Sequence, residues 1–289
     1  MDFWIGLALD VLTAIAVVLL SAIGLYVIYG LMRVINMAHG DMMMVGAYCT
    51  AASLQVTGSF WLGLLFASLV VGMLGFFIER LILRRLYGRG NLATLLATWG
   101  VGLVIVEVVR LWVGPSGWFV DAPLDRVISI YNTPYPLYSS FLVLCALALL
   151  TLMWLLLTRS TLGIVIRATM EDPARAEAMG INTDAVYRWS FVSGSLLAGI
   201  AGGLLAPISA VTPYMGSDSA TRAFLVVIVG GFGSLLSPIT GSTLVGGARA
   251  LLSSFLGVTT ATIGMFSIVL ITLLVKPLGI TVKGRPDEF

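Results

Sequence analysis

A group of polar side chains stands between two long apolar stretches near the start of the chain. Residues 34–48 read VINMAHGDMMMVGAY, and they contain Asn36, Asp41 and the only histidine, His39. A histidine beside a carboxylate can transfer protons, and with a serine it can build a hydrolytic site. No nucleophile motif accompanies the HGD triplet. A hydrolase built around His39 is therefore the least favoured hypothesis, and we expect no catalytic residue.

The other residues that could carry chemistry exclude several classes of site. The two cysteines, Cys49 and Cys145, lie in separate apolar windows, and with a single histidine they provide no metal site. The two lysines, Lys276 and Lys283, do not belong to a GxxxxGKS/T motif, so the chain has no P-loop for ATP. No mixed aromatic and basic pattern indicates nucleic acid. We therefore expect no metal, no cofactor and no nucleic-acid partner for this chain.

The composition is that of a membrane protein. Of the 289 residues, 59% are hydrophobic and only 10% are charged, whereas a soluble domain of this length carries far more surface charge. The charge-free windows are 11–32, 42–78, 90–106, 127–158, 189–217, 223–248 and 250–275. A spanning helix needs about 20 mostly apolar residues, and no window alternates as a barrel strand would. The windows predict an all-α, polytopic helical membrane protein with about eight or nine spans, and we favour nine.

The arginines and lysines indicate which ends of these spans face the cytoplasm. They concentrate in three clusters: Arg80, Arg84, Arg85 and Arg89; Arg159, Arg167, Arg175 and Arg188; and Lys276, Lys283 and Arg285. Cytoplasmic segments carry the excess of positive charge, so these clusters are predicted to be cytoplasmic. Segments 114–137 and 211–222 are then external, and 114–137 is predicted to be an ordered loop. The N-terminus is predicted outside and the C-terminus in the cytoplasm.

Two apolar stretches are interrupted in a way that is typical of a transport pathway. The cluster at 36–41 interrupts the first half of the chain, and Gly230, Gly231 and Gly233 interrupt AFLVVIVGGFGSLLSPITGS in the second. Irregular backbone at membrane depth is tolerated only where protein or a water-filled cavity satisfies its polar groups. Interrupted helices at corresponding places in two halves point to a substrate pathway. We therefore predict interrupted helices and two weakly related halves.

The longest polar interruption contains a compact helix, predicted over 173–179, with both ends marked. Asp172 can cap its N-terminus, Pro173 suits the first helical position, and Gly180 suits the left-handed position beyond its end. The candidates for capping the next span are Asn182, Thr183 and Asp184. A connector on the membrane surface and a lever that docks into a partner both fit this helix.

Contacts between spans are also predicted. Ser195, Gly199 and Gly203 are small residues four apart, which lets another helix approach closely. Glu107 and Arg110 are three apart, so they share a helix face and are predicted to form a structural ion pair.

The order and spacing of four segments are similar to those of a known family. The segments are GLYVIYGLMRVINMAHGDMMMVGAY, LYGRGNLATLLATWG, LGIVIRATMEDPARAEAMGIN and AFLVVIVGGFGSLLSPITGS. With them the chain resembles, over nearly its whole length, the permease subunits of bacterial branched-chain (hydrophobic) amino acid ABC importers. That group also includes urea and short-amide permeases. The forms INMAHG and LATLLATWG lean toward the urea-type branch, so the substrate stays open between these classes.

The resemblance implies a transporter rather than an enzyme, with the chain forming a single transmembrane permease domain over 1–289. Such a permease lies in the lipid of the bacterial inner membrane and pairs with a second homologous permease or a second copy of itself. It sits on two cytoplasmic ATPase subunits, which bind ATP and Mg, and receives substrate from a periplasmic substrate-binding protein. The segment EAMG is similar to the loop that contacts the ATPases, which makes 173–179 the coupling helix. The residues assigned to this contact are Asp172, Pro173, Glu177, Ala178 and Gly180.

Within that framework, the cluster at 36–41 is predicted to hold a helix break beside the pathway. Asn36 or Asp41 can cap the helix that follows, and His39 can bond exposed carbonyls of the helix before. Direct contact of these side chains with substrate is left open. The alternative function is an ion-coupled secondary transporter or channel for a small polar solute. That mechanism needs intramembrane carboxylates, for which only Asp41 and Glu107 are candidates.

Overall fold

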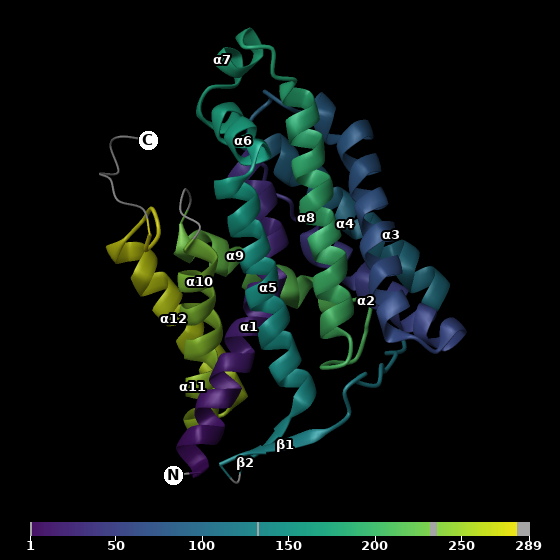
Figure 1. The fold of residues 1–289 in the computed structure, drawn as a ribbon, viewed down its shortest axis with the longest axis vertical. Coiled ribbons are helices and arrows are strands. Elements are labelled where there is room, and N and C mark those ends of the chain that lie inside the picture. The colour runs from purple at the N-terminus through teal and green to yellow at the C-terminus, as the bar shows by residue number, and fades with distance from the viewer. Residues whose placement is uncertain (1, 132, 232–235, 282–289) are drawn as a thin grey trace. The chain divides into compact units, whose positions relative to one another are not determined.

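Helices dominate the computed structural model, which describes residues 2–131, 133–231 and 236–281 (Figure 1). In chain order the elements are α1 (Asp2–Met32), α2 (His39–Thr57), α3 (Phe60–Leu81), the 3₁₀ turn η1 (Leu83–Arg85), α4 (Asn91–Val113), β1 (Val127–Ile130), β2 (Thr133–Pro136), α5 (Leu137–Arg159), α6 (Thr161–Glu171), α7 (Pro173–Ala178), α8 (Thr183–Leu205), α9 (Met215–Gly230), α10 (Ser237–Ser242), the π-helical turn η2 (Thr243–Gly247), α11 (Ala248–Leu256) and α12 (Val258–Val275). The prediction of an all-α fold is confirmed. Gly233, Lys283 and Arg285, which carried predictions above, lie outside the described residues.

Five helical stretches of the described chain are long and apolar enough to cross a membrane. They are Asp2–Met32, Phe60–Arg85, Asn91–Val113, Leu137–Arg159 and Val258–Val275. The predicted total of nine requires further crossings through α2, α8 and the segment 215–256, and it stays a prediction.

The segment 114–137 contains a pair of short strands that the sequence did not predict. β1 and β2 are antiparallel, with Val127 opposite Pro136 and Ile130 opposite Thr133. Proline fits such a two-stranded ribbon, because among the described residues each strand has one edge without a neighbouring strand. The segment between α4 and β1 contains no helix, in agreement with the predicted loop.

A turn at 58–59 separates α2 from α3, and its residue types explain it. Gly58 follows α2 with a left-handed backbone, φ 67°, a conformation that costs glycine little. The Ser59 hydroxyl then accepts a hydrogen bond from the Leu62 N–H at 3.4 Å and caps α3. One apolar window of the sequence is thereby divided into two helices.

The chain forms two compact units that are discontinuous in sequence. One, here called the α8 unit, comprises Ile23–Val120 and Leu150–Ala220. The other, here called the α12 unit, comprises Met1–Ala22, Asp121–Leu149 and Thr221–Phe289. The single permease domain expected from the sequence stays a prediction.

In the α8 unit, helices α2, α3 and α8 approach one another closely through glycines. A Cβ placed on Gly46 of α2 would lie 2.6 Å from the carbonyl oxygen of Gly199 in α8. A Cβ on Gly199 would lie 2.7 Å from the Ala67 carbonyl oxygen of α3, and one on Gly203 would lie 2.5 Å from Thr50 Oγ1 of α2. Backbones can come this near only where side chains are absent. The close packing predicted for the small residues of this span is confirmed.

Gly199→Ala is expected to destabilise the permease, because its methyl group would collide with the Ala67 carbonyl and push α3 away from α8. Overpacking of this kind costs about 1–3 kcal/mol. Gly30→Ala is the control, since the nearest atom to a Cβ at Gly30 is 3.8 Å away, an ordinary contact. Thermal unfolding in detergent should show a lower midpoint for Gly199→Ala alone. Equal midpoints for the two variants would contradict a tight α3–α8 contact.

Candidate functional site

A non-helical segment, residues 33–38, separates α1 from α2, and Thr98 of α4 holds it in place. The fully buried Thr98 hydroxyl lies 3.1 Å from the Ile35 carbonyl oxygen and 3.0 Å from the Met37 nitrogen. It accepts a hydrogen bond from the Met37 N–H, and its single proton is shared among the Ile35 carbonyl and, within α4, the carbonyls of Thr94 at 2.9 Å and Leu95 at 3.0 Å. The Met37 N–H and the Ile35 carbonyl, which the helix break leaves without helical partners, thus lie within hydrogen-bond distance of a protein hydroxyl. The predicted break is confirmed, although no sequence signal pointed to Thr98.

The predicted capping of α2 by Asn36 or Asp41 is wrong. Ala38 is the N-cap residue of α2, and no side chain of the described residues caps this end. Ala38 has φ −75° and ψ 0°, so the turn runs into the helix without the extended residue from which a capping side chain reaches back. The Asn36 amide nitrogen lies 3.7 Å from the Met42 sulfur instead, and Asn36 Oδ1 has no hydrogen-bond partner within the described chain.

His39 and Asn36 are both fully buried, which places them inside the packing of the α8 unit. A Cβ on Gly24 of α1 would lie 2.9 Å from His39 Cε1 and 2.6 Å from the Gly194 carbonyl oxygen of α8. The absence of a side chain at Gly24 therefore leaves the space that the imidazole occupies. His39 thus lies where α1 and α8 come together with the start of α2.

Asp41 lies two residues after His39 in α2, and its side chain lies between two glycines of other helices. A Cβ on Gly216 would lie 2.7 Å from Asp41 Oδ1, and a Cβ on Gly102 would overlap Asp41 Oδ2. Gly102 is the middle residue of the membrane-length helix α4, about 17 Å from either end at 1.5 Å per residue. Gly216 is the second residue of α9, whose N-terminus carries partial positive charge. The Asp41 side chain is partly exposed and forms no ion pair with the described residues.

The predicted second break is also present, in the α12 unit. Helix α9 ends at Gly230, and Gly231 follows with a left-handed backbone, φ 81°. The Thr281 hydroxyl donates to the Gly230 carbonyl at 2.6 Å, and the Ile280 N–H donates to the Val229 carbonyl at 2.9 Å. A segment distant in sequence thereby satisfies carbonyls that the broken helix exposes.

The predicted coupling helix is α7, and its ends follow the predicted signals. The Asp172 carboxylate accepts a hydrogen bond from the Arg175 N–H at 3.1 Å, and Pro173 is the first helical residue. At the other end Gly180 has φ 85°, and its N–H donates to the Glu177 carbonyl at 2.9 Å. The helix ends at Ala178, one residue earlier than predicted.

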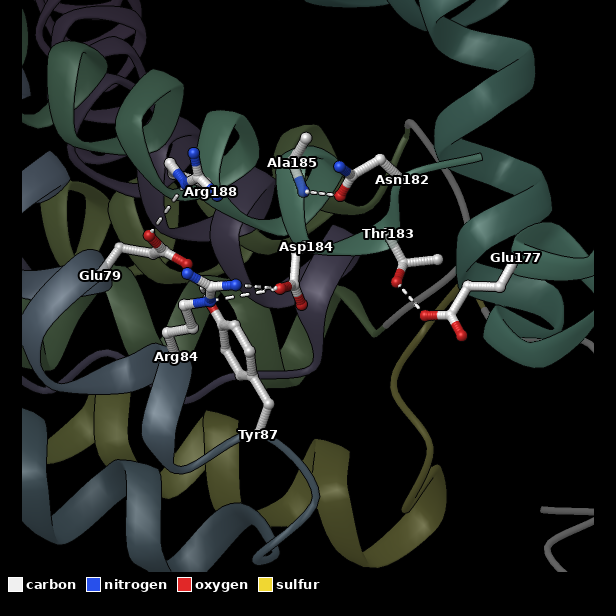
Figure 2. Close-up of polar contacts among 9 residues, drawn as sticks. All are labelled: Glu79, Arg84, Tyr87, Glu177, Asn182, Thr183, Asp184, Ala185 and Arg188. Carbon is white, nitrogen blue, oxygen red and sulfur yellow. Dashed lines mark hydrogen bonds and ion pairs between the residues drawn. The ribbon is translucent and has the colours of Figure 1, made fainter. Parts of the chain in front are cut away.

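Only part of α7 is available to a partner. Ala174 and Ala178 are exposed, whereas Ala176 is fully buried. The Glu177 carboxylate accepts a hydrogen bond from the Thr183 hydroxyl at the start of α8 (Figure 2). Glu177 thus joins α7 to α8, in addition to any contact it makes with another chain.

The start of α8 is capped by the first of its three predicted candidates. Asn182 Oδ1 accepts a hydrogen bond from the Ala185 N–H at 2.9 Å, as Figure 2 shows. The other two candidates, Thr183 and Asp184, face α7 and η1 through the bonds to Glu177 and Arg84. The first turn of α8 therefore contacts the elements on both sides of it.

Spanning-length apolar helices, two helix breaks and a short capped helix in a polar segment make this chain a polytopic helical membrane protein with interrupted helices. Residues 7–275 match the family of permease components of branched-chain amino acid transport systems. The chain belongs to this family, and it is a permease subunit of an ABC importer.

Individual relatives cover most of the chain. It is 31% identical to the high-affinity branched-chain amino acid permease LivH of Salmonella typhimurium, over 93% of this chain and 91% of that protein. Identity to BraD of Pseudomonas aeruginosa is 28%, over 93% and 92%. The solved structure of PsaBC from Streptococcus pneumoniae in complex with Fab matches with a TM-score of 0.53 at 14% identity, covering 93% of this chain and 91% of that one. At this identity the structural match shows the fold alone.

Gly102→Ala is expected to displace the Asp41 carboxylate and to reduce substrate uptake while the permease still inserts in the membrane. The loss should be roughly tenfold, since overpacking costs about 1–3 kcal/mol. Gly100→Ala, two residues away on α4, has open space around its Cβ and serves as the control. Uptake and abundance should be measured on the same membranes. Wild-type uptake by Gly102→Ala would show that the Asp41 position is unimportant.

Proposed function

We propose that this chain imports branched-chain or other hydrophobic amino acids into the cytoplasm across a bacterial inner membrane. The observation that carries the proposal is the match to branched-chain amino acid permeases over about nine-tenths of the chain. Urea or a short amide is the second candidate substrate, and it is supported by INMAHG and LATLLATWG.

The family works with ATPase and substrate-binding partners. In the proposed assembly, two cytoplasmic ATPase subunits hold ATP and Mg, and a second homologous permease or a second copy of this chain completes the membrane part. A periplasmic protein delivers the substrate, and this chain binds no cofactor. The three basic clusters support an N-terminus outside and a C-terminus in the cytoplasm.

The proposed substrate pathway runs past the helix break at Asn36, His39 and Asp41. Substrate sites of transporters are commonly formed near the bilayer midplane by interrupted helices. The depth of Asp41, opposite the middle of α4, supports such a place, and so does the absence of an ion pair with any described residue. Gly230 and Gly231 are assigned to the pathway because they interrupt α9.

The ion-coupled alternative has less support. Glu107, one of its two candidate carboxylates, is bonded to Arg110 at 2.6 Å on the same helix, and about half of its side chain is exposed. The predicted structural ion pair is confirmed, so Glu107 is occupied. Of the two candidate carboxylates for ion coupling, Asp41 alone is then left.

The substrate can be identified by uptake competition in vesicles that carry the permease with its ATPase and binding-protein partners. We expect ATP-dependent uptake of labelled leucine that unlabelled isoleucine and valine inhibit, while urea and acetamide do not. Burying the apolar side chain of leucine contributes about 1.5–3 kcal/mol of binding free energy, and urea and acetamide lack such a side chain. This difference limits how strongly the transporter can prefer leucine over the smaller amides. Transport of urea or acetamide without competition by leucine would assign the chain to the second candidate.

Ala178→Asp is expected to abolish uptake. The permease should still fold and insert, because Ala178 is an exposed position of α7. Burying an unpaired charge in a contact with an ATPase subunit would cost several kcal/mol. On a solvated connector the same charge would change stability by less than about 0.5 kcal/mol.

Asn91→Asp is the matched control, since it adds the same negative charge at an exposed position outside α7. Co-purification of the ATPase subunits should be lost in Ala178→Asp and kept in Asn91→Asp. If Ala178→Asp retains its ATPases and transports normally, α7 is only a connector.

A further inference from the structure

Glu79, in the last turn of α3, is a buried carboxylate to which the sequence assigned no role. It is the only Asp, Glu, Lys or Arg of the described residues whose side chain is buried. Glu79 Oε1 accepts a hydrogen bond from the Tyr87 hydroxyl at 3.0 Å, and Oε2 lies 3.5 Å from Arg188 Nε of α8 (Figure 2). Neither Oε2 nor Arg188 Nε has a hydrogen bond within the described residues. Charge attraction without a formed hydrogen bond therefore joins α3 to α8.

The ion pair between Glu79 and Arg188 does not fully offset the cost of burying the Glu79 carboxylate. Taking a carboxylate out of water costs several kcal/mol, and an opposite charge offsets this only when geometry is good and the remaining lone pairs are bonded. Here one of the two carboxylate oxygens is not bonded. A displacement of α8 by less than an ångström would bring Arg188 into hydrogen-bond range of Glu79, since such bonds are about 2.7–2.9 Å long. Small movements of α8 therefore change the energy of this contact.

The same end of α8 is joined to its neighbours by further contacts. Asp184 accepts a bond from Arg84 of η1 at 2.8 Å, and the Tyr187 ring lies 5.3 Å from the ring of Tyr87 between centroids. Thr183 bonds to Glu177 of α7. The first two turns of α8 thus touch α7 on one side and the region from Glu79 to Tyr87 on the other, as Figure 2 shows.

Further along, α8 packs on the helix that carries Asp41. A Cβ on Gly202 would overlap the Met43 carbonyl oxygen, so the backbones of α8 and α2 are in contact two residues from Asp41. A shift at the start of α8 can therefore reach both α3 and the proposed pathway through packed elements.

We propose that Glu79, Arg188 and Tyr87 form a joint that transmits displacement of α7 to α3 and α8, and thereby couples ATP hydrolysis to uptake. The inference rests on the proposed docking of α7 to an ATPase subunit. Glu79 and Arg188 are positioning residues in this role and touch neither substrate nor nucleotide. Burial and the Glu79 carboxylate raise the pKa of Tyr87, so its hydroxyl stays protonated and keeps donating to Glu79.

The test measures ATP hydrolysis and amino acid uptake in one sample of the whole assembly reconstituted in liposomes. Glu79→Gln keeps the side-chain shape and an acceptor for Tyr87 but removes the charge. Uptake per ATP hydrolysed should fall roughly fivefold or more, the lower range of coupling between sites, while hydrolysis continues. A purely structural role would lower both activities together. Adding Arg188→Met to Glu79→Gln should restore thermal stability, because no unpaired buried charge is then left, but should not restore uptake per ATP hydrolysed, because the attraction between α3 and α8 is still absent.

Glu107→Gln is the matched control, since it breaks an exposed ion pair of the same type on α4 and should leave the ratio unchanged. Tyr87→Phe leaves both charges in place and should also lower uptake per ATP hydrolysed. It replaces Glu79→Gln as the test variant if Glu79→Gln accumulates poorly. A wild-type ratio in Glu79→Gln and Tyr87→Phe, beside loss of uptake in Ala178→Asp, would overturn the joint and leave the docking of α7 intact. Absence of ATP-driven uptake in the wild-type assembly would refute the proposed function on which the joint rests.

Discussion

A polypeptide in lipid must satisfy its own backbone polar groups, and this constraint determines how the broken helices of this permease are built. In water, the carbonyls and N–H groups at a helix break would bond to solvent. Here Thr98 lies within hydrogen-bond distance of Ile35 and Met37 at one break, and Thr281 bonds Gly230 at the other. Each break is thus fixed by a hydroxyl from a distant segment. Irregular backbone can then persist at both breaks with these groups bonded within the protein.

The glycines of α8 follow from a related constraint. Lipid tails are as apolar as leucine, so helices gain little from hiding apolar surface against each other and associate through close packing instead. Gly199 and Gly203 let the backbone of α8 approach α3 and α2 within carbonyl and hydroxyl contact. Such interdigitated contacts transmit strain, because tightly packed interiors have few voids. The polar first turns of α8 and its glycine face therefore both contact α3, and the glycine face also contacts α2.

Features determined by neighbouring residues were predictable from the sequence. The turn at Gly58, the capping of α7 by Asp172 and the left-handed Gly180 depend on residue types within one helical turn. The helix breaks and the pair between Glu107 and Arg110 were predictable for the same reason. Capping of α2 was not, because Ala38 occupies the cap position and its own backbone already has right-handed helical dihedral angles.

Features that depend on the tertiary fold could not be inferred in this way. Thr98 is more than 60 residues from the backbone groups it holds, and Arg188 is more than 100 residues from Glu79. The glycines that enclose Asp41, Gly102 and Gly216, belong to two different helices. A single sequence carries no signal for such pairs, since each residue also fits an ordinary packing role in its own helix.

The acidic residues of the apolar segments show why environment, rather than residue type, separates structural from functional roles. Glu107 is half exposed and bonded to Arg110, and pairs of this kind contribute about 0–1 kcal/mol to stability. Glu79 is buried with one oxygen unbonded, and Asp41 has no ion pair among the described residues at the depth of the middle of α4. A charge held in apolar surroundings without full compensation lowers the stability of the fold. Replacing both members of the Glu79–Arg188 pair by neutral side chains of similar size would cost the fold less. A role in transport would therefore explain why carboxylates are present at Asp41 and Glu79. Glu107 needs no such explanation.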